Sequence, residues 1–147
     1  MAAFLRKKAK RLVIVGCGGF GRETLDWALQ AQSNATTSEY EDICMVDKKK
    51  PDFNIFPRLQ PVYNGTLMQY VPQQNDFVVI AIGDSIRRSE VDNILRNKQA
   101  NFGSVIHPTA LISTSSYWGE GAILAPHVVV TTDVKVGRHA HMNVATS

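Results

Sequence analysis

A period of six residues limits what the carboxyl-terminal part of this chain can fold into. Every sixth residue there is apolar: Ile112, Trp118, Leu124, Val130, Val136 and Met142. A repeat of six matches neither the 3.6-residue turn of an α-helix nor the plain alternation of a β-strand. It is typical of hexapeptide repeats, in which three short strands make one coil of a parallel β-helix in about 18 residues. The pattern therefore predicts a β-helix whose apolar residues point to its axis.

Two neighbouring positions in each repeat support this prediction. Small or aliphatic residues stand two places before the apolar ones, at Ala110, Ser116, Ala122, Val128, Val134 and Ala140. Short residues suited to a crowded corner follow directly after the apolar residues, at Ser113, Gly119, Ala125, Thr131, Gly137 and Asn143. The stretch from Ala110 to Ser147 is long enough for about two coils. No capping repeat ends it, so we expect either further coils beyond Ser147 or another chain over the open end.

The preceding residues show a different pattern, in which strands and helices alternate. Short apolar runs predict strands at 11–16, 42–48, 62–67, 76–84 and 102–108, and helical periodicity predicts helices at 21–32 and 85–98. Asp84 or Ser85 is placed to cap the second helix. This order is typical of an α/β unit with a mainly parallel sheet. We therefore predict a small Rossmann-like domain over residues 1–108, followed by the first coils of a left-handed parallel β-helix over 109–147.

Composition places the chain among soluble globular proteins. Hydrophobic residues make up 44% of its 147 residues and charged residues 20%, and no apolar run approaches a membrane span. The amino terminus lacks the apolar length of a secretory signal, and two cysteines make no disulfide framework, so a reducing cytoplasm is expected. The net charge is +3, with a basic cluster at residues 6–11. Because no aromatic or basic residues extend this cluster, we interpret it as a solvated arm and expect no nucleic-acid partner.

The stretch "VIVGCGGFGRE", residues 13–23, follows the first predicted strand and contains four glycines. Such a loop lets the backbone approach an anion, and the amide hydrogens of the following helix point at it. The spacing also fits the dinucleotide fingerprint G-x-G-x-x-G, which alone is weak evidence. A sugar nucleotide, NAD(P) and a purely structural turn therefore remain open. The α/β unit ends near residue 108, which leaves room for one mononucleotide-binding half and disfavours NAD(P).

The order of motifs resembles one family over nearly the whole chain. The matching segments are "VIVGCGGFGRE" (13–23), "VDK" (46–48), "NGT" (64–66), "VVIAIGD" with Arg87 (78–87), "FGSVIHPTALIS" (102–113), "GEGAIL" (119–124) and "VKVGRHAHMN" (134–143). They are similar to bacterial sugar acetyltransferases of the hexapeptide-repeat superfamily. Sialic acid O-acetyltransferase and the UDP-amino-sugar N-acetyltransferases typify this family, which serves surface-glycan synthesis.

The resemblance implies that the protein acts on a nucleotide-activated (UDP-linked) amino sugar or sialic acid and that the α/β domain holds its nucleotide part. It also implies that acetyl-CoA is the co-substrate, that no metal takes part, and that the β-helix forms a homotrimer. The implied substrate-binding residues are Gly16, Gly18, Gly19, Phe20, Gly21, Arg22, Asp47, Lys48, Gly83 and Asp84. Among them Asp47 ends the second predicted strand, where a carboxylate can accept hydrogen bonds from a base or ribose.

In the family, the histidine that deprotonates the acceptor follows the "H-x-N" segment by several residues. Here that segment is His141–Asn143, so the expected base falls past Ser147, and we assign no catalytic residue. We expect His127, His139 and His141 to point outward as solvated side chains, and His107 to be a hydrogen-bonded structural residue. A non-catalytic nucleotide-sugar-binding or assembly module is the alternative to an enzyme, and an NAD(P)-binding domain is a third reading.

The remaining candidates have structural interpretations. Cys17 lies at a helix amino terminus, where a thiolate would be stabilised, yet a small residue filling a tight turn explains it better. Cys44 is predicted to lie in the core of a strand. Trp118 is predicted to pack inside the coil. The histidines and acidic residues lack the spacing of metal ligands.

Overall fold

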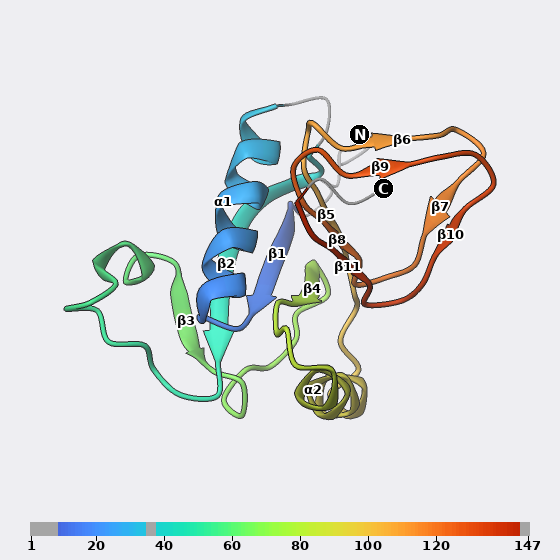
Figure 1. The fold of residues 1–147 in the computed structure, drawn as a ribbon. Helices are drawn as coiled ribbons and strands as arrows, with labels where there is room; N and C mark the ends of the chain where they lie inside the picture. Colours follow the sequence, from blue (N-terminus) through green and yellow to red (C-terminus); the bar gives the residue numbers. More distant parts are fainter. Residues whose placement is uncertain (1–8, 35–37, 145–147) are drawn as a thin grey trace, which may run out of the picture.

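The computed structural model describes residues 9–34 and 38–144. Its sheet has four strands: β1 (Lys10–Val15), β2 (Tyr40–Asp47), β3 (Tyr63–Thr66) and β4 (Asp76–Ile80). Their spatial order is β3-β2-β1-β4, and every neighbouring pair is parallel (Figure 1). The central strand β1 therefore has a partner on each side, which suits its uninterrupted apolar sequence. The predicted α/β class with a parallel sheet is confirmed.

Two helices cover the two faces of this sheet. Helix α1 (Gly19–Ser33) connects β1 to β2, and α2 (Ser85–Asn97) follows β4; a short 3-10 helix, η1, spans Pro57–Leu59. Side chains of β1 alternate between the faces, so Leu12 and Ile14 join the core under α1. Val13 and Val15 join a second core, which also contains Leu95 of α2.

The carboxyl-terminal strands wind into a coil with three faces. They are β5 (Val105–Ile106), β6 (Leu111–Ile112), β7 (Tyr117–Trp118), β8 (Ile123–Leu124), β9 (Val129–Val130), β10 (Lys135–Val136) and β11 (His141–Met142). One face is β5-β8-β11, the second is β6-β9 and the third is β7-β10, and all pairs are parallel. In Figure 1 the three faces form a triangle beside α1. Pairing at steps of about 18 residues confirms the predicted coil length.

The sequence predicts residues 102–108 to form the last strand of the α/β unit, and this prediction is wrong about which strands they pair with. Only Phe102 bridges to the sheet, at Val78, whereas β5 pairs with β8 of the coil. One apolar core also runs without a break from the α1 face of the sheet into the coil, where it includes Val105 and Leu124. Short strands in a repeat pair with the next coil rather than with a neighbouring sheet, which explains the difference. The division between residues 108 and 109 stays a prediction.

The tight corners of the coil differ from those expected. Left-handed backbone recurs at Gly121, His127, Asp133 and His139, with φ of 77°, 61°, 61° and 52°. These residues lie three places after the axial residue, not directly after it. The same conformation occurs at two histidines and an aspartate, so it is space that favours glycine at Gly121, where an added Cβ would lie 2.0 Å from His139 Nδ1.

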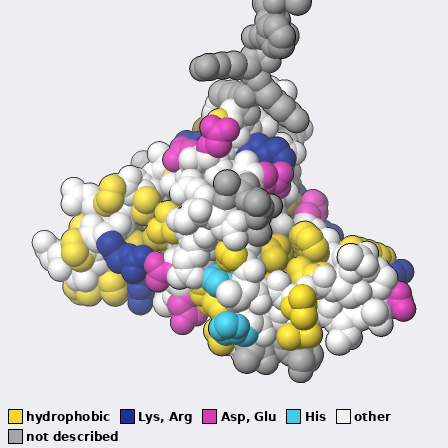
Figure 2. All heavy atoms as spheres, turned by 90° about the horizontal axis from the view of Figure 1, so that it is seen from above, with side chains coloured by type: hydrophobic (Ala, Val, Ile, Leu, Met, Phe, Trp, Pro, Cys, Tyr) yellow, Lys and Arg dark blue, Asp and Glu magenta, His cyan; other side chains and the backbone are white. Residues whose placement is uncertain are grey.

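Trp118 does not pack inside the coil as predicted. Its side chain is 41% exposed, and its indole Nε1 donates a hydrogen bond to Ser104 Oγ at 3.1 Å. The first coil has no earlier coil to cover this residue, which explains the exposure. Figure 2 shows further apolar side chains at the surface. The exposed large apolar residues of the coil are Leu111, Tyr117, Trp118, Val129, Val134 and Val144.

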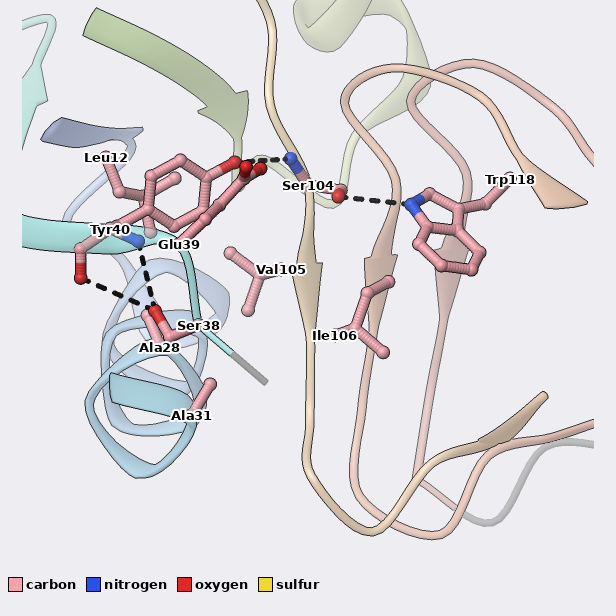
Figure 3. A pocket seen from close by; sticks show the side chains of 10 residues that line it. All are labelled: Leu12, Ala28, Ala31, Ser38, Glu39, Tyr40, Ser104, Val105, Ile106 and Trp118. Atoms are coloured by element: carbon pink, nitrogen blue, oxygen red, sulfur yellow. Dashed lines mark hydrogen bonds between the residues drawn. The ribbon is translucent and has the colours of Figure 1, made fainter. Parts of the chain in front are cut away.

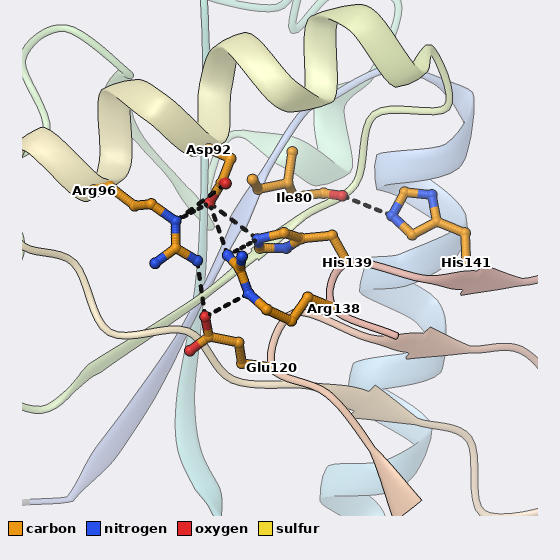
Figure 4. A network of polar contacts seen from close by, with 7 residues as sticks. All are labelled: Ile80, Asp92, Arg96, Glu120, Arg138, His139 and His141. Atoms are coloured by element: carbon orange, nitrogen blue, oxygen red, sulfur yellow. Dashed lines mark hydrogen bonds and ion pairs between the residues drawn. The ribbon is translucent and has the colours of Figure 1, made fainter. Parts of the chain in front are cut away.

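A polar network joins α2 to two loops of the coil (Figure 4). Asp92 of α2 contacts Arg96 Nε and His139 Nε2, each at 3.0 Å. Glu120 accepts from both Arg96 and Arg138 at 2.8 Å. These alternating charges hold the helix against the coil, although their partial exposure limits what each pair contributes.

The basic cluster is more structured than a solvated arm where the structure describes it. Lys10 pairs with Glu39, and Arg11 pairs with the buried carboxylate of Asp76 at 2.8 Å. Both residues lie in β1, so their stems are fixed by the sheet. Residues 6–8 of the cluster lie outside the described residues.

In residues 9–34 and 38–144, no helix has the length and apolarity needed to cross a membrane. No group of three or more histidine, cysteine, aspartate or glutamate side chains in that part of the chain is arranged to hold a metal ion. Cys17 and Cys44 are free and buried, as expected from their positions. Burial raises the pKa of the Cys17 thiol to about 12, which opposes a thiolate there.

Candidate functional site

The glycine-rich loop lies where β1, β2 and β4 end. Gly16 donates its N–H to Val46 O of β2, and Ala81, just past β4, donates to Val15 O, both at 2.8 Å. The loops that follow β1 and β4 therefore start side by side at the carboxyl edge of the sheet. In open parallel sheets, ligands bind at this edge.

The structure separates the loop's glycines into two kinds. Gly16 has a φ of +117°, and a Cβ added there would lie 2.7 Å from Ala81 O. A Cβ on Gly21 would lie 1.9 Å from Gly16 O. Gly16 is therefore required where the loop passes the backbone after β4, and Gly21 where α1 packs against the end of its own strand. By contrast, a Cβ on Gly18, Gly19 or Gly83 would meet nothing within 4 Å.

Asp47 fixes the loop from the neighbouring strand. Its Oδ2 accepts from Cys17 N at 2.7 Å, and its Oδ1 accepts from Lys48 N at 2.6 Å. The carboxylate thus holds the glycine loop to the end of β2. Lys48 itself is exposed beside it. Whether these two residues also contact a base or ribose stays a prediction.

Arg22 and Phe20, two more predicted site residues, lie against protein atoms. Arg22 Nη1 donates to Cys17 O at 3.0 Å, and its guanidinium lies 4.0 Å from the centre of the Phe56 ring. Phe20 packs between Trp27 and His141, with ring centroids 5.8 Å and 4.6 Å away. Both side chains therefore support the first turn of α1, where Arg22 keeps a positive charge beside the loop.

Asp84 has the capping role predicted for it. Its side chain accepts from Arg87 N at 2.8 Å and so satisfies an amide at the start of α2. Gly83, next to it, is exposed. The predicted residues from the first and fourth strands are thus brought to one edge, with open space above Gly18, Gly19 and Gly83.

His141 departs most from expectation. It points away from the coil axis, as predicted, but into the α/β unit rather than into solvent. Its Nε2 contacts Ile80 O at 2.9 Å (Figure 4). Its ring also packs against the Phe20 ring in a tilted arrangement. The register explains this, because His141 pairs with Ile123, which pairs with Val105. That column of the coil packs on the sheet and α1.

Sequence reasoning missed the partner of His141. Arg88 of α2 lies 3.4 Å from His141 Nδ1. The register of the coil was available from the six-residue period, so the inward-facing column could have been inferred. The contact with Arg88 depends on how the coil docks on the sheet, which no local pattern gives.

The other three histidines have simpler roles. His107 is buried, and its ring contacts Thr109 Oγ1 at 2.8 Å and the side chain of Gln30, as expected for a structural residue. His139 binds Asp92 and packs edge-on to Phe102, so the solvated side chain predicted for it is wrong. His127 is exposed, as predicted.

His141 gives a testable pH dependence. Burial and the nearby Arg88 lower the pKa of His141 from 6.5 to about 4, with a smaller effect from His139. The unfolded chain therefore takes up a proton first as the pH falls, and folding stability is lost between pH 6.5 and 4. His141→Phe should remove up to about 3 kcal/mol of this loss, because each pKa unit is worth about 1.36 kcal/mol.

Urea unfolding of the two proteins from pH 8 to pH 4 measures the effect. At pH 8 the wild type should have the larger free energy of unfolding, because it keeps the hydrogen bond to Ile80 O. This difference should shrink or change sign by pH 4. A constant difference across this range would contradict the prediction. His107, whose pKa burial also lowers, is present in both proteins and cancels.

A hollow of about 260 Å³ lies at the opposite edge of the sheet (Figure 3). Its walls come from β1, α1, the start of β2 and the first coil, and include Leu12, Tyr40, Ser104 and Trp118. The predicted site residues do not line it. Because ligands of parallel sheets bind at the carboxyl ends of the strands, we place the site at the other edge, which carries the glycine-rich loop and which we call the glycine edge.

Comparison with known proteins supports the fold and the family. Residues 11–95 match the family described as the PglD N-terminal domain. Over 135 residues, the chain is 27% identical to GDP-perosamine N-acetyltransferase of Escherichia coli O157:H7. That alignment covers 89% of this chain and 58% of the relative.

Two solved structures are similar in fold. The acetyltransferase domain of PglB from Neisseria gonorrhoeae FA1090, in complex with acetyl coenzyme A, has a TM-score of 0.73 at 23% identity, over 92% of this chain and 62% of that one. PerB from Caulobacter crescentus, in complex with CoA and GDP-perosamine, has a TM-score of 0.67 at 23% identity, over 91% and 60%. The chain thus spans about three fifths of the length of these relatives.

Proposed function

Because this chain belongs to the family of PglD N-terminal domains, we propose that it binds a nucleotide-linked amino sugar at the glycine edge of its sheet. The observation that carries the proposal is the open space above Gly18, Gly19 and Gly83. These glycines border the first turn of α1, whose amide hydrogens favour an anion. The diphosphate of a nucleotide sugar is an anion of this kind.

We place this binding within an acetyltransferase that takes its acetyl group from acetyl-CoA. A relative with 27% identity is named as an N-acetyltransferase, so we put a sugar amine before a hydroxyl as the acceptor. The amine would lose a proton to a base as it attacks the thioester carbonyl, and the carbon–sulfur bond would break to release CoA as its thiol. We assign this base to none of the described histidines. His107 and His139 are held in structural contacts, His127 lies on the outer surface of the coil, and His141 already uses Nε2 on Ile80 O.

The proposal also concerns which base the nucleotide carries. The sequence resemblance favours a UDP-sugar, whereas the names of the relatives point to GDP-perosamine. Asp47 and Lys48 lie at the carboxyl end of β2, beside the loop, where a base or ribose would reach them. A homotrimer built through the coil also stays a proposal, with exposed Leu111, Tyr117 and Val129 as its candidate contacts.

The Gly18→Asp variant tests the site without harming the fold. Gly18 caps α1 in an extended conformation, with φ of −71° and no side-chain bond. Aspartate is a favoured cap, so the variant should fold as well as the wild type. Its carboxylate would bond the amides meant for the phosphate and repel the ligand, and we expect at least a tenfold loss of affinity for UDP or GDP.

Calorimetry with UDP, GDP, NAD and acetyl-CoA gives the readout. Gly18→Ser is the matched control, because serine caps the helix equally well without a charge. Unchanged nucleotide affinity in Gly18→Asp would contradict the site. Preference of the wild type for NAD would replace the proposed function by a dinucleotide-binding one, and nucleotide binding without acetyl transfer by the whole protein would favour a non-catalytic module.

A further inference from the structure

Arg88 and His141 meet at the glycine edge from opposite parts of the chain. Arg88 lies in the first turn of α2 and His141 in β11 of the coil. Arg88 Nη1 donates to Ile82 O at 2.9 Å and to Gly83 O at 3.1 Å, and it lies 3.4 Å from His141 Nδ1. One guanidinium nitrogen is therefore fixed by the loop after β4 and by the coil together.

The contacts of His141 determine which of its nitrogens carries the proton. Ile80 O, 2.9 Å from Nε2, can only accept, so Nε2 holds the hydrogen. Nδ1 of the neutral ring then carries a lone pair that faces Arg88 Nη1 at 3.4 Å, and it shares the two Nη1 hydrogens with the nearer carbonyls of Ile82 and Gly83. The Phe20 ring, tilted by 35° with its centroid 4.6 Å away, packs against the imidazole. His141 thus presents an acceptor to Arg88 from a fixed position.

Arg88 is partly buried and carries a positive charge without a carboxylate partner among the described residues. Its contacts in that part of the chain all involve Nη1, and they are two carbonyls and an imidazole. A guanidinium offers five hydrogen-bond donors in a planar fork, so Nε and Nη2 remain to bind an anion. Gly83, whose carbonyl holds Arg88, is one of the open positions of the site.

We propose that Arg88 binds the diphosphate of the nucleotide sugar and that His141 is the positioning residue that aims it. This inference rests on the proposed function and adds a binding residue to it. Because His141 belongs to the coil, the coil's docking sets where the guanidinium points. The nucleotide site is therefore completed by the coil and not by the α/β unit alone.

The test compares UDP and GDP, whichever the wild type binds, with the corresponding monophosphate. Arg88→Ala should lose about tenfold to a hundredfold in diphosphate affinity, the range of a charge-assisted bond to phosphate. Its loss for the monophosphate should be smaller. Arg87→Ala is the matched control, because it removes the same charge one residue away and should change the affinity less than about twofold.

His141→Phe keeps a ring on Phe20 and removes both nitrogens. We expect a loss of about threefold to tenfold in diphosphate affinity, and no further loss when the change is added to Arg88→Ala. The ligand-free variants are melted first, and Arg88→Lys, which keeps the charge but not the fork, replaces Arg88→Ala if that variant is unfolded.

The outcomes separate the two levels of the proposal. A wild type that binds neither nucleotide overturns the proposed function and this inference with it. A wild type that binds, with Arg88→Ala and Arg88→Lys equally tight, overturns the role of Arg88 alone. An equal loss from His141→Phe in the presence and absence of Arg88 would make His141 structural and overturn its positioning role.

Discussion

The Gly21→Ala variant is expected to lose about 3 kcal/mol or more of folding stability, at the upper end of what overpacking costs. Gly21 is buried on the side of α1 that faces the end of β1. An added methyl would lie 1.9 Å from Gly16 O and 2.6 Å from Gly16 C. Both atoms are backbone at a tight turn, so relief requires moving α1 away from the sheet. The contacts that Leu25 and Trp27 of α1 make with the core would then be lost as well.

Gly19→Ala is the matched control for this prediction. Gly19 is the first residue of α1, and an added Cβ meets nothing within 4 Å. Alanine should be neutral there or stabilise by up to about 1 kcal/mol, because it is the better helix former. Urea unfolding of both variants measures the difference. Similar midpoints for Gly21→Ala and Gly19→Ala would show that the loop does not pack as described.

Asp76→Ala is expected to destabilise the fold by about 3 kcal/mol. The Asp76 side chain is 1% exposed and receives Arg11 Nε at 2.8 Å, Tyr70 Oη at 2.8 Å and Gln73 N at 3.0 Å. Removing the carboxylate leaves a partly buried guanidinium and a buried hydroxyl without their acceptor. The ion pair also joins β1 to β4, so its loss weakens the contact between these two neighbouring strands.

The same carboxylate predicts how stability changes in acid. Burial alone would raise the pKa of Asp76, yet the hydrogen bonds from Arg11, Gln73 and Tyr70 outweigh it and lower that pKa below 3.8. The unfolded state therefore binds the proton first. The contribution of Asp76 is fully present above about pH 4 and is lost as the pH falls through the folded pKa.

Unfolding free energies at pH 7 and at pH 3 check both statements. The difference in unfolding free energy between the wild type and Asp76→Ala should be larger at pH 7 than at pH 3. Glu41→Ala, which removes an exposed carboxylate on β2, is the control and should change stability by less than about 0.5 kcal/mol. A variant of Asp76 as stable as that control would refute the role given to this ion pair.

Much of the fold could be predicted because local patterns determine it. The alternation of Leu12 and Ile14 with Val13 and Val15 requires a strand buried on both faces. Asp84 is a capping residue by its chemistry, and it caps α2. The six-residue period sets the length of each coil, since three repeats of six make one coil of about 18 residues.

The site was harder to predict from the sequence, because glycines that serve packing cannot be distinguished there from glycines that face open space. Gly16 is needed beside the backbone after β4 and Gly21 where α1 meets its own strand, whereas Gly18 and Gly19 face open space. The difference depends on distances between backbone segments that only the folded chain brings together. For the same reason, an isolated glycine pattern is weak evidence for a ligand.

The sequence by itself determined the elements, their order and the coil, since hydrophobic period, capping chemistry and glycine position act over a few residues. The tertiary structure alone decided where the coil docks. Docking buries the column of Val105, Ile123 and His141 against the sheet and brings His141 to Arg88, 53 positions away in the chain. Burial of shared apolar surface drives this docking. Because the hydrophobic effect is not directional, no short sequence motif specifies which surfaces meet.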